Sequence, residues 1–97
     1  MAHYVATVED AGPDTAVGLW FPDLPGCFSA GDSVDEALLN ACEAISLYAE
    51  SLANEGRPLP KPRAVSALRA DPNVAEDLRD HVVALIAFNE GSERAAE

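Results

Sequence analysis

Residues 20–31 constrain the fold most strongly, because two prolines and two glycines leave their backbone little freedom. Proline cannot donate a hydrogen bond to a sheet, and its ring fixes its own φ. Pro25 followed by Gly26 suits the two central positions of a type II turn, where the second residue needs a positive φ. The stretch therefore predicts a strand, a tight corner, and a second short strand that ends at Gly31, just before a helix.

Three segments around this corner have strand patterns, rich in Val, Tyr and Thr or alternating in hydropathy. They are residues 3–9, 16–21 and 27–30. Alternation along the second segment places Val17, Leu19 and Phe21 on one face and Trp20 on the other. Because the connections are short, we expect consecutive strands to pair as an antiparallel meander.

The longest predicted element is a helix of about 22 residues that begins after Ser33. Ser33 and Glu36 have the spacing of a capping box, and acidic residues in the first turn favour the helix dipole. One apolar stripe follows at spacings of three and four, at Leu38, Ala41, Ile45, Tyr48 and Leu52. Cys42 widens this stripe, so we place it in the core. Gly56 supplies the C-terminal stop.

The remainder of the chain predicts smaller elements. Residues 57–62 alternate proline with other residues and form a stiff, extended linker. Short helical turns are expected over 64–69 and 73–79, the second capped by Asn73. Residues 81–88 form an apolar run of strand length. Because both faces of that run are apolar, we predict a buried or paired strand and not an exposed edge.

Charge is distributed unevenly along the chain, whose formal net charge is −11. All six Lys and Arg residues lie from Arg57 onward, whereas residues 1–56 have none. The acidic residues of that N-terminal part are Glu9, Asp10, Asp14, Asp23, Asp32, Asp35, Glu36, Glu43, Glu50 and Glu55. Such a surface repels nucleic acid and attracts a basic partner, although general solubility explains the charge equally well.

Catalytic and cofactor motifs are absent from the sequence. It has no phosphate-binding glycine loop, no metal-spaced His/Cys set and no nucleophile elbow. Cys27 and Cys42 are too few for a disulfide scaffold or a zinc site, and we place Cys27 in the core. A divalent-metal nuclease site built from Glu9, Asp10, Asp14 and helix acids is the catalytic alternative. Glu36, Glu43 and Glu50, however, are seven residues apart and form a solvated stripe. We expect no enzyme, metal or cofactor.

No apolar run approaches the length of about 20 residues that a membrane helix needs, and the first residues lack a charged signal-peptide start. We therefore expect a cytoplasmic protein. Ninety-seven residues are enough for one domain with one modest core. We assign residues 1–90 to this domain and residues 91–97 to a polar C-terminal tail.

Three blocks in order resemble the HicB antitoxin family of toxin–antitoxin systems. The first is Phe21, Pro22, Asp23, Leu24, Pro25, Gly26 and Cys27, the second spans residues 31–37, and the third spans 56–62. The resemblance covers about residues 3–63. It implies an α+β fold described as a partially degraded ribonuclease H fold, with a three-stranded antiparallel meander, a long helix and a further strand beside the first. The order of elements predicted above agrees with it.

The resemblance also implies a function. Members of this family bind HicA, a small basic mRNA-cleaving toxin, and block its active site. Many continue into a DNA-binding module, whereas this chain ends about nine residues after its last strand, so we do not expect operator binding by it alone. Asp23, Asp32 and Asp35, grouped by prediction around the corner and the helix start, are the candidate partner-binding acids, together with Trp20. The alternative is a homodimeric or larger structural or regulatory module without a toxin.

Overall fold

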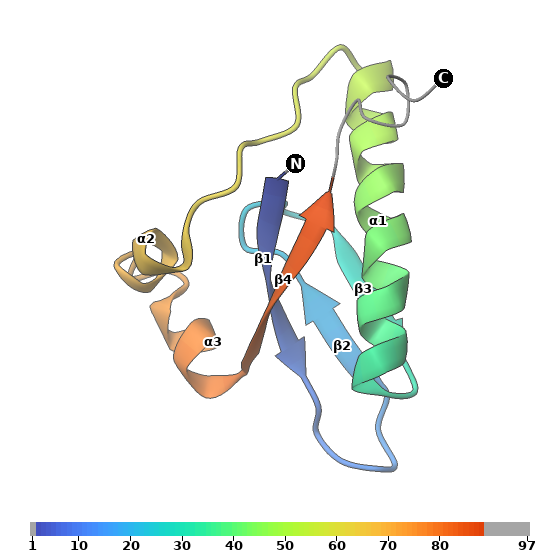
Figure 1. Ribbon diagram of the computed structural model, residues 1–97, viewed down its shortest axis with the longest axis vertical. Coiled ribbons are helices and arrows are strands. Elements are labelled where there is room, and N and C mark those ends of the chain that lie inside the picture. Colours follow the sequence, from blue (N-terminus) through green and yellow to red (C-terminus); the bar gives the residue numbers. More distant parts are fainter. Residues whose placement is uncertain (1, 89–97) are drawn as a thin grey trace.

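The computed structural model describes residues 2–88 and shows an α+β domain in which one sheet separates two layers of helix (Figure 1). The elements are β1 (Ala2–Glu9), β2 (Val17–Trp20), β3 (Phe28–Gly31), α1 (Val34–Asn54), α2 (Val65–Arg69), α3 (Ala75–Asp80) and β4 (Val82–Phe88). The sheet order is β3-β2-β1-β4, and every neighbouring pair is antiparallel. The predicted fold class is confirmed, and the expected tail at 91–97 lies outside the described residues.

Alternation along the strands gives the sheet two buried faces. Even-numbered residues of β1 and odd-numbered residues of β2 pack against α1, in a core completed by Ala37, Ala41 and Ile45. The opposite face of β1 is covered by α2 and α3, where Val5 packs against Leu68 and Leu78. The predicted facing of β2 is confirmed, because Val17 and Leu19 are buried in the α1 core and Trp20 is not part of it.

Capping fixes both ends of α1. The backbone N–H of Glu36 donates to Ser33 Oγ at 3.1 Å, and the Glu36 carboxylate accepts from the N–H of Asp32 at 2.7 Å. These bonds satisfy backbone donors that a helix start leaves without partners. At the other end, Gly56 has φ +71°, and Arg57 N–H donates to the carbonyl of Leu52 at 2.8 Å. The predicted start and stop are confirmed.

The proline corner is a type II turn, as predicted. Gly26 has φ +86°, and the N–H of Cys27 donates to the carbonyl of Leu24 at 3.0 Å. The Tyr48 hydroxyl donates to the carbonyl of Pro25 at 2.9 Å, so α1 holds the corner directly. Cys27 is buried, and burial raises the pKa of its thiol, as expected of a core residue.

An ion-pair staple joins this corner to the proline-rich linker. Asp23 accepts from both the backbone N–H and Nε of Arg63, each at 2.7 Å, and Arg63 Nη1 lies 3.0 Å from the Asp71 carboxylate. The Asp23 side chain is only 7% exposed. Asp71 in turn accepts from the N–H of Asn73, and that hydrogen bond, with the bond from Arg63, holds the pKa of Asp71 below its ordinary value.

Three predictions about local environment were wrong. β4 pairs only with β1 among the described residues, so it is an edge strand of this chain and not a central one. Cys42 is exposed, because it lies beside the inward stripe of α1 and not within it. Asn73 does not cap α3: that helix begins at Ala75, and the Asp71 carbonyl accepts from the N–H groups of Val74 and Ala75 instead.

The junction between β3 and α1 depends on the absence of a side chain at Gly31. A Cβ placed there would lie 2.7 Å from the backbone nitrogen of Ala37 and 2.8 Å from Cβ of Glu36. Backbone atoms in the first turn of a helix cannot move aside as the end of a flexible side chain can. A glycine is therefore required for the strand to pass this close to the helix.

We predict that Gly31→Ala lowers the free energy of unfolding by about 1–3 kcal/mol, because the added methyl group forces β3 and α1 apart. Gly18→Ala is the matched control, since a Cβ at Gly18 meets nothing within 4 Å. It should change stability by less than about 0.5 kcal/mol. Urea unfolding measures both. Equal stability of the two variants would contradict this account of Gly31.

The staple predicts a pH-dependent contribution to stability. A carboxyl group whose pKa is lowered by folding stabilises the folded state above its unfolded pKa of about 4, and this contribution disappears as pH falls through the lowered value. The urea midpoint of the wild type should therefore exceed that of Asp71→Asn near neutral pH, and the two should converge in acid. The control is Asp14→Asn, since Asp14 is exposed and forms no ion pair with a described residue. A constant difference between the wild type and Asp71→Asn at every pH would show that the charge of Asp71 has no part in it.

Candidate partner-binding surface

Ion pairing leaves most of the N-terminal acids without a cationic partner. Within residues 2–88, the ion pairs are made by Arg57, Arg63 and Arg79. From the N-terminal part they engage only Glu55 and Asp23. The acids of the loop after β1, of the helix start and of the outer side of α1 form no ion pair with a described residue. Their negative charge is therefore not neutralised by a described Lys or Arg side chain.

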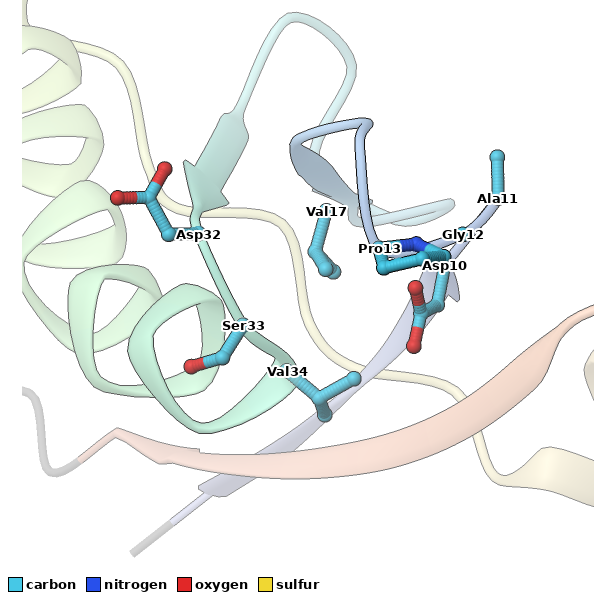
Figure 2. A pocket seen from close by; sticks show the side chains of 8 residues that line it. All are labelled: Asp10, Ala11, Gly12, Pro13, Val17, Asp32, Ser33 and Val34. Carbon is cyan, nitrogen blue, oxygen red and sulfur yellow. The ribbon is translucent and has the colours of Figure 1, made fainter.

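Four of these acids lie at one end of the molecule, which we call the acidic end: Asp10, Asp14, Asp32 and Asp35. The antiparallel meander brings them there, because β1 ends and β3 ends on either side of the start of β2. Asp10 and Asp32 line an open hollow of about 510 Å³ with Pro13, Val17 and Ser33 (Figure 2). All four aspartates are exposed.

The carboxylates of this end do not converge. Figure 2 shows Asp10 and Asp32 on opposite sides of the hollow, with the Asp32 carboxylate pointing away from Asp10. In the part of the chain that the structure describes, no three His, Cys, Asp or Glu side chains are placed to hold a metal ion. The arrangement suits electrostatic contact with a cationic surface better than coordination of a metal.

The structure does not bring the four predicted site residues onto one surface. Asp32 and Asp35 lie at the acidic end, close to the start of α1. Asp23 lies beyond the opposite end of β2 and β3, where Trp20 pairs with Phe28. Its carboxylate forms an ion pair with Arg63. Its geometry is that of a structural residue, and its predicted role in partner binding stays untested.

Trp20 occupies a third position, on the face of the sheet opposite α1. It is half-buried, and its ring meets that of His81 edge-on, with centroids 5.2 Å apart and an interplanar angle of 80°. Beside it on β3, Phe28 is 69% exposed. Trp20 therefore lies outside the acidic end, on the face of the sheet opposite α1.

Sequence reasoning did not include Asp10 and Asp14 among the partner-binding candidates. The signal that could have found them was the predicted meander itself. In an antiparallel meander, the loop after the first strand and the end of the third strand lie at the same end of the sheet. Asp10 and Asp14 therefore had to join Asp32, whereas Asp23, one strand length away, could not.

Among the described residues, no helix is both long enough and apolar enough to cross a membrane. Parts of this chain are similar to curated proteins. The uncharacterized 14.9 kDa protein in the rep-hol intergenic region of Haemophilus phage HP1 is 40% identical over 65 residues, which are 67% of this chain and 46% of that protein. The UPF0150 protein ssr1765 of Synechocystis is 55% identical over 40 residues, 41% of this chain and 51% of that protein. The chain thus spans about half the length of these curated relatives.

Solved structures share the fold. The antitoxin HicB of Burkholderia pseudomallei superposes with a TM-score of 0.77 at 28% identity, covering 94% of this chain and 66% of that one. A chain of the HicA3 and HicB3 toxin–antitoxin complex superposes with a TM-score of 0.69 at 28% identity, covering 90% of this chain and 98% of that one. The family described as "HicB_like antitoxin of bacterial toxin-antitoxin system" matches residues 4–95. With sequence, sheet order and long helix in agreement, the chain belongs to the HicB-like antitoxin family.

Proposed function

We propose that this chain neutralises a small, basic, mRNA-cleaving toxin of the HicA type by covering the active site of that toxin. The observation that carries the proposal is the acidic end, where four exposed aspartates have no ion pair with a described residue. Membership of the antitoxin family and the likeness to a chain of the HicA3 and HicB3 complex support it.

The physical reason is charge complementarity. A site that binds mRNA must attract phosphate groups, so its surroundings are positively charged. Unpaired carboxylates steer such a surface toward the acidic end and penalise partners of the wrong charge. Asp32 and Asp35 are the predicted contacts that the geometry favours, and we add Asp10 and Asp14 to them.

We further propose that the chain acts by binding and not by catalysis, in the cytoplasm, where mRNA is found. Operator DNA is not part of the proposed function of this chain, because the acidic surface repels phosphate.

The second candidate is a homo-oligomeric structural or regulatory module without a toxin, which the exposed apolar edge strand β4 favours. Co-expression with a HicA-type toxin separates the two: growth rescue and co-purification support the first, and their absence supports the second.

Charge reversal tests the surface. We predict that Asp32→Lys combined with Asp35→Lys slows association with the toxin at least tenfold at low salt, because steering depends on local charge. The association rate, measured at two salt concentrations, should also become less sensitive to salt. Glu43→Lys combined with Glu50→Lys is the matched control, with the same change of net charge on the outer side of α1.

Each result has a defined meaning. If the control pair alone slows association, the contact surface is the outer side of α1, and the acidic end is the wrong choice. If neither pair changes the rate or the growth rescue, charge complementarity does not carry the interaction. Circular dichroism and urea unfolding confirm that each variant is folded, which the exposure of all four side chains leads us to expect.

A further inference from the structure

The sheet carries two apolar cores of very different size, one on each face. The core around α1 contains twelve buried residues. The second core, on the opposite face, consists of Val5, Leu68 and Leu78, with a few partly buried valines around it. No residue from 60 to 83 packs in the core around α1. The small core is therefore the apolar contact that holds α2 and α3 to the sheet.

The two helices of this layer are too short to be stable alone. α2 has five residues and α3 has six, and neither begins with a side-chain cap. Isolated helices of this length are unstable in water, so α2 and α3 depend on their contact with the sheet. Because Leu68 of α2 and Leu78 of α3 pack in the same core, loss of that contact affects both helices at once.

Both ends of this layer are fixed to the larger part of the molecule. On the N-terminal side, Leu59 packs against the core around α1, and Asp23 accepts from the backbone N–H and from Nε of Arg63. On the C-terminal side, β4 pairs with β1, and Ile86 is buried in the core around α1. Residues 64–81 can therefore detach while both attachments remain. Figure 1 shows α2 and α3 as a layer on the side of the sheet away from α1.

We propose that residues 64–81 form a lid that opens as one unit, while the sheet and α1 stay folded. The second face of β1 and β4 is then available only in the open form. Cooperative parts of a protein can open at a free energy below that of global unfolding. The closed lid is latched by the ion pair between Arg63 Nη1 and the Asp71 carboxylate, which are 3.0 Å apart. Because Asp23 holds Arg63 at the corner, opening separates Asp71 from Arg63.

A buried hydroxyl on the covered face lowers the cost of opening. Thr7 pairs with Val83, which packs against the second core, and it lies on the same face of β1 as Val5. Thr7 Oγ1 is buried and forms no hydrogen bond with a described residue. A buried hydroxyl without a partner costs free energy. Water that enters when the lid opens can satisfy it, so the closed form is less favoured than its apolar contacts alone would make it.

Amide hydrogen exchange on the purified full chain tests the lid without the proposed toxin. The N–H groups of Leu68, Leu78 and His81 donate to carbonyls within the lid, whereas Ala41 and Ile45 lie inside α1. We expect the three lid amides to share one opening constant, at least tenfold larger than that of the two α1 amides. Lid opening should also respond less to urea, because it exposes less surface than global unfolding.

Two substitutions separate lid opening from global unfolding. Ile45 is fully buried in the core around α1, which is packed alike in the closed and open forms. Ile45→Val should raise the opening constant of the α1 amides at least twofold and leave that of the lid amides unchanged. Asp71→Asn removes a contact that exists only in the closed form. Near neutral pH it should therefore raise both opening constants by the same factor.

A thiol probe reports directly on the covered face. In a Cys42→Ser background, Val5→Cys places a thiol against Leu68 and Leu78. Cys27, which is buried in the core around α1, is the internal reference. The thiol at position 5 should react with an aromatic disulfide reagent at least tenfold faster than Cys27. Circular dichroism confirms that the variant is folded.

Three outcomes would overturn the proposal. Equal opening constants for the lid and α1 amides, both raised by Ile45→Val, would show that the domain unfolds as one unit. Lid amides that exchange with unrelated opening constants would show that α2 and α3 fray separately. Equal reaction rates of the two thiols would show that the second face is uncovered only when the core around α1 unfolds. Exchange on the wild type needs no substitution, so it decides the matter even if Val5→Cys does not fold.

Discussion

The close contact between Gly31 and the first turn of α1 is the constraint on which the rest of the structure depends. Only Asp32 and Ser33 separate the strand from the helix, so the junction has no slack to absorb an added side chain. The contact sets the direction in which α1 crosses the sheet. The apolar stripe of α1 then meets the α1-facing sides of β1 and β2 in one core.

The same contact decides where charge is placed. By holding the helix start against the end of β3, it puts Asp32 and Asp35 beside the loop that carries Asp10 and Asp14. At the other end of the sheet, Asp23 is neutralised by Arg63, and that ion pair joins the corner to the linker that leads to α2. Asp23 therefore stabilises the fold, whereas the four aspartates of the acidic end are exposed and form no ion pair with a described residue.

Much of the fold could be predicted because its signals are local. The turn at Pro25 and Gly26, the cap at Ser33 and the helix stop at Gly56 each depend on a few neighbouring residues. Errors arose where an environment depends on distant residues. Cys42 fits an apolar stripe by its spacing, but its exposure depends on how far α1 overlaps β4. Asn73 is a good capping residue, but Asp71 already organises that turn.

The sequence by itself determined the elements, their order, the α+β class and the family. Strand alternation, helix periodicity and turn chemistry each depend on residues that are close together in the sequence. Only the tertiary structure decided which acids lie at the same end of the sheet and which strand has no second neighbour among the described residues. Asp23 and Asp32 are close in sequence but lie at opposite ends of β3, and an apolar strand has the same pattern whether its second neighbour belongs to its own chain or to another. Those properties depend on pairing between distant segments, which no local pattern specifies.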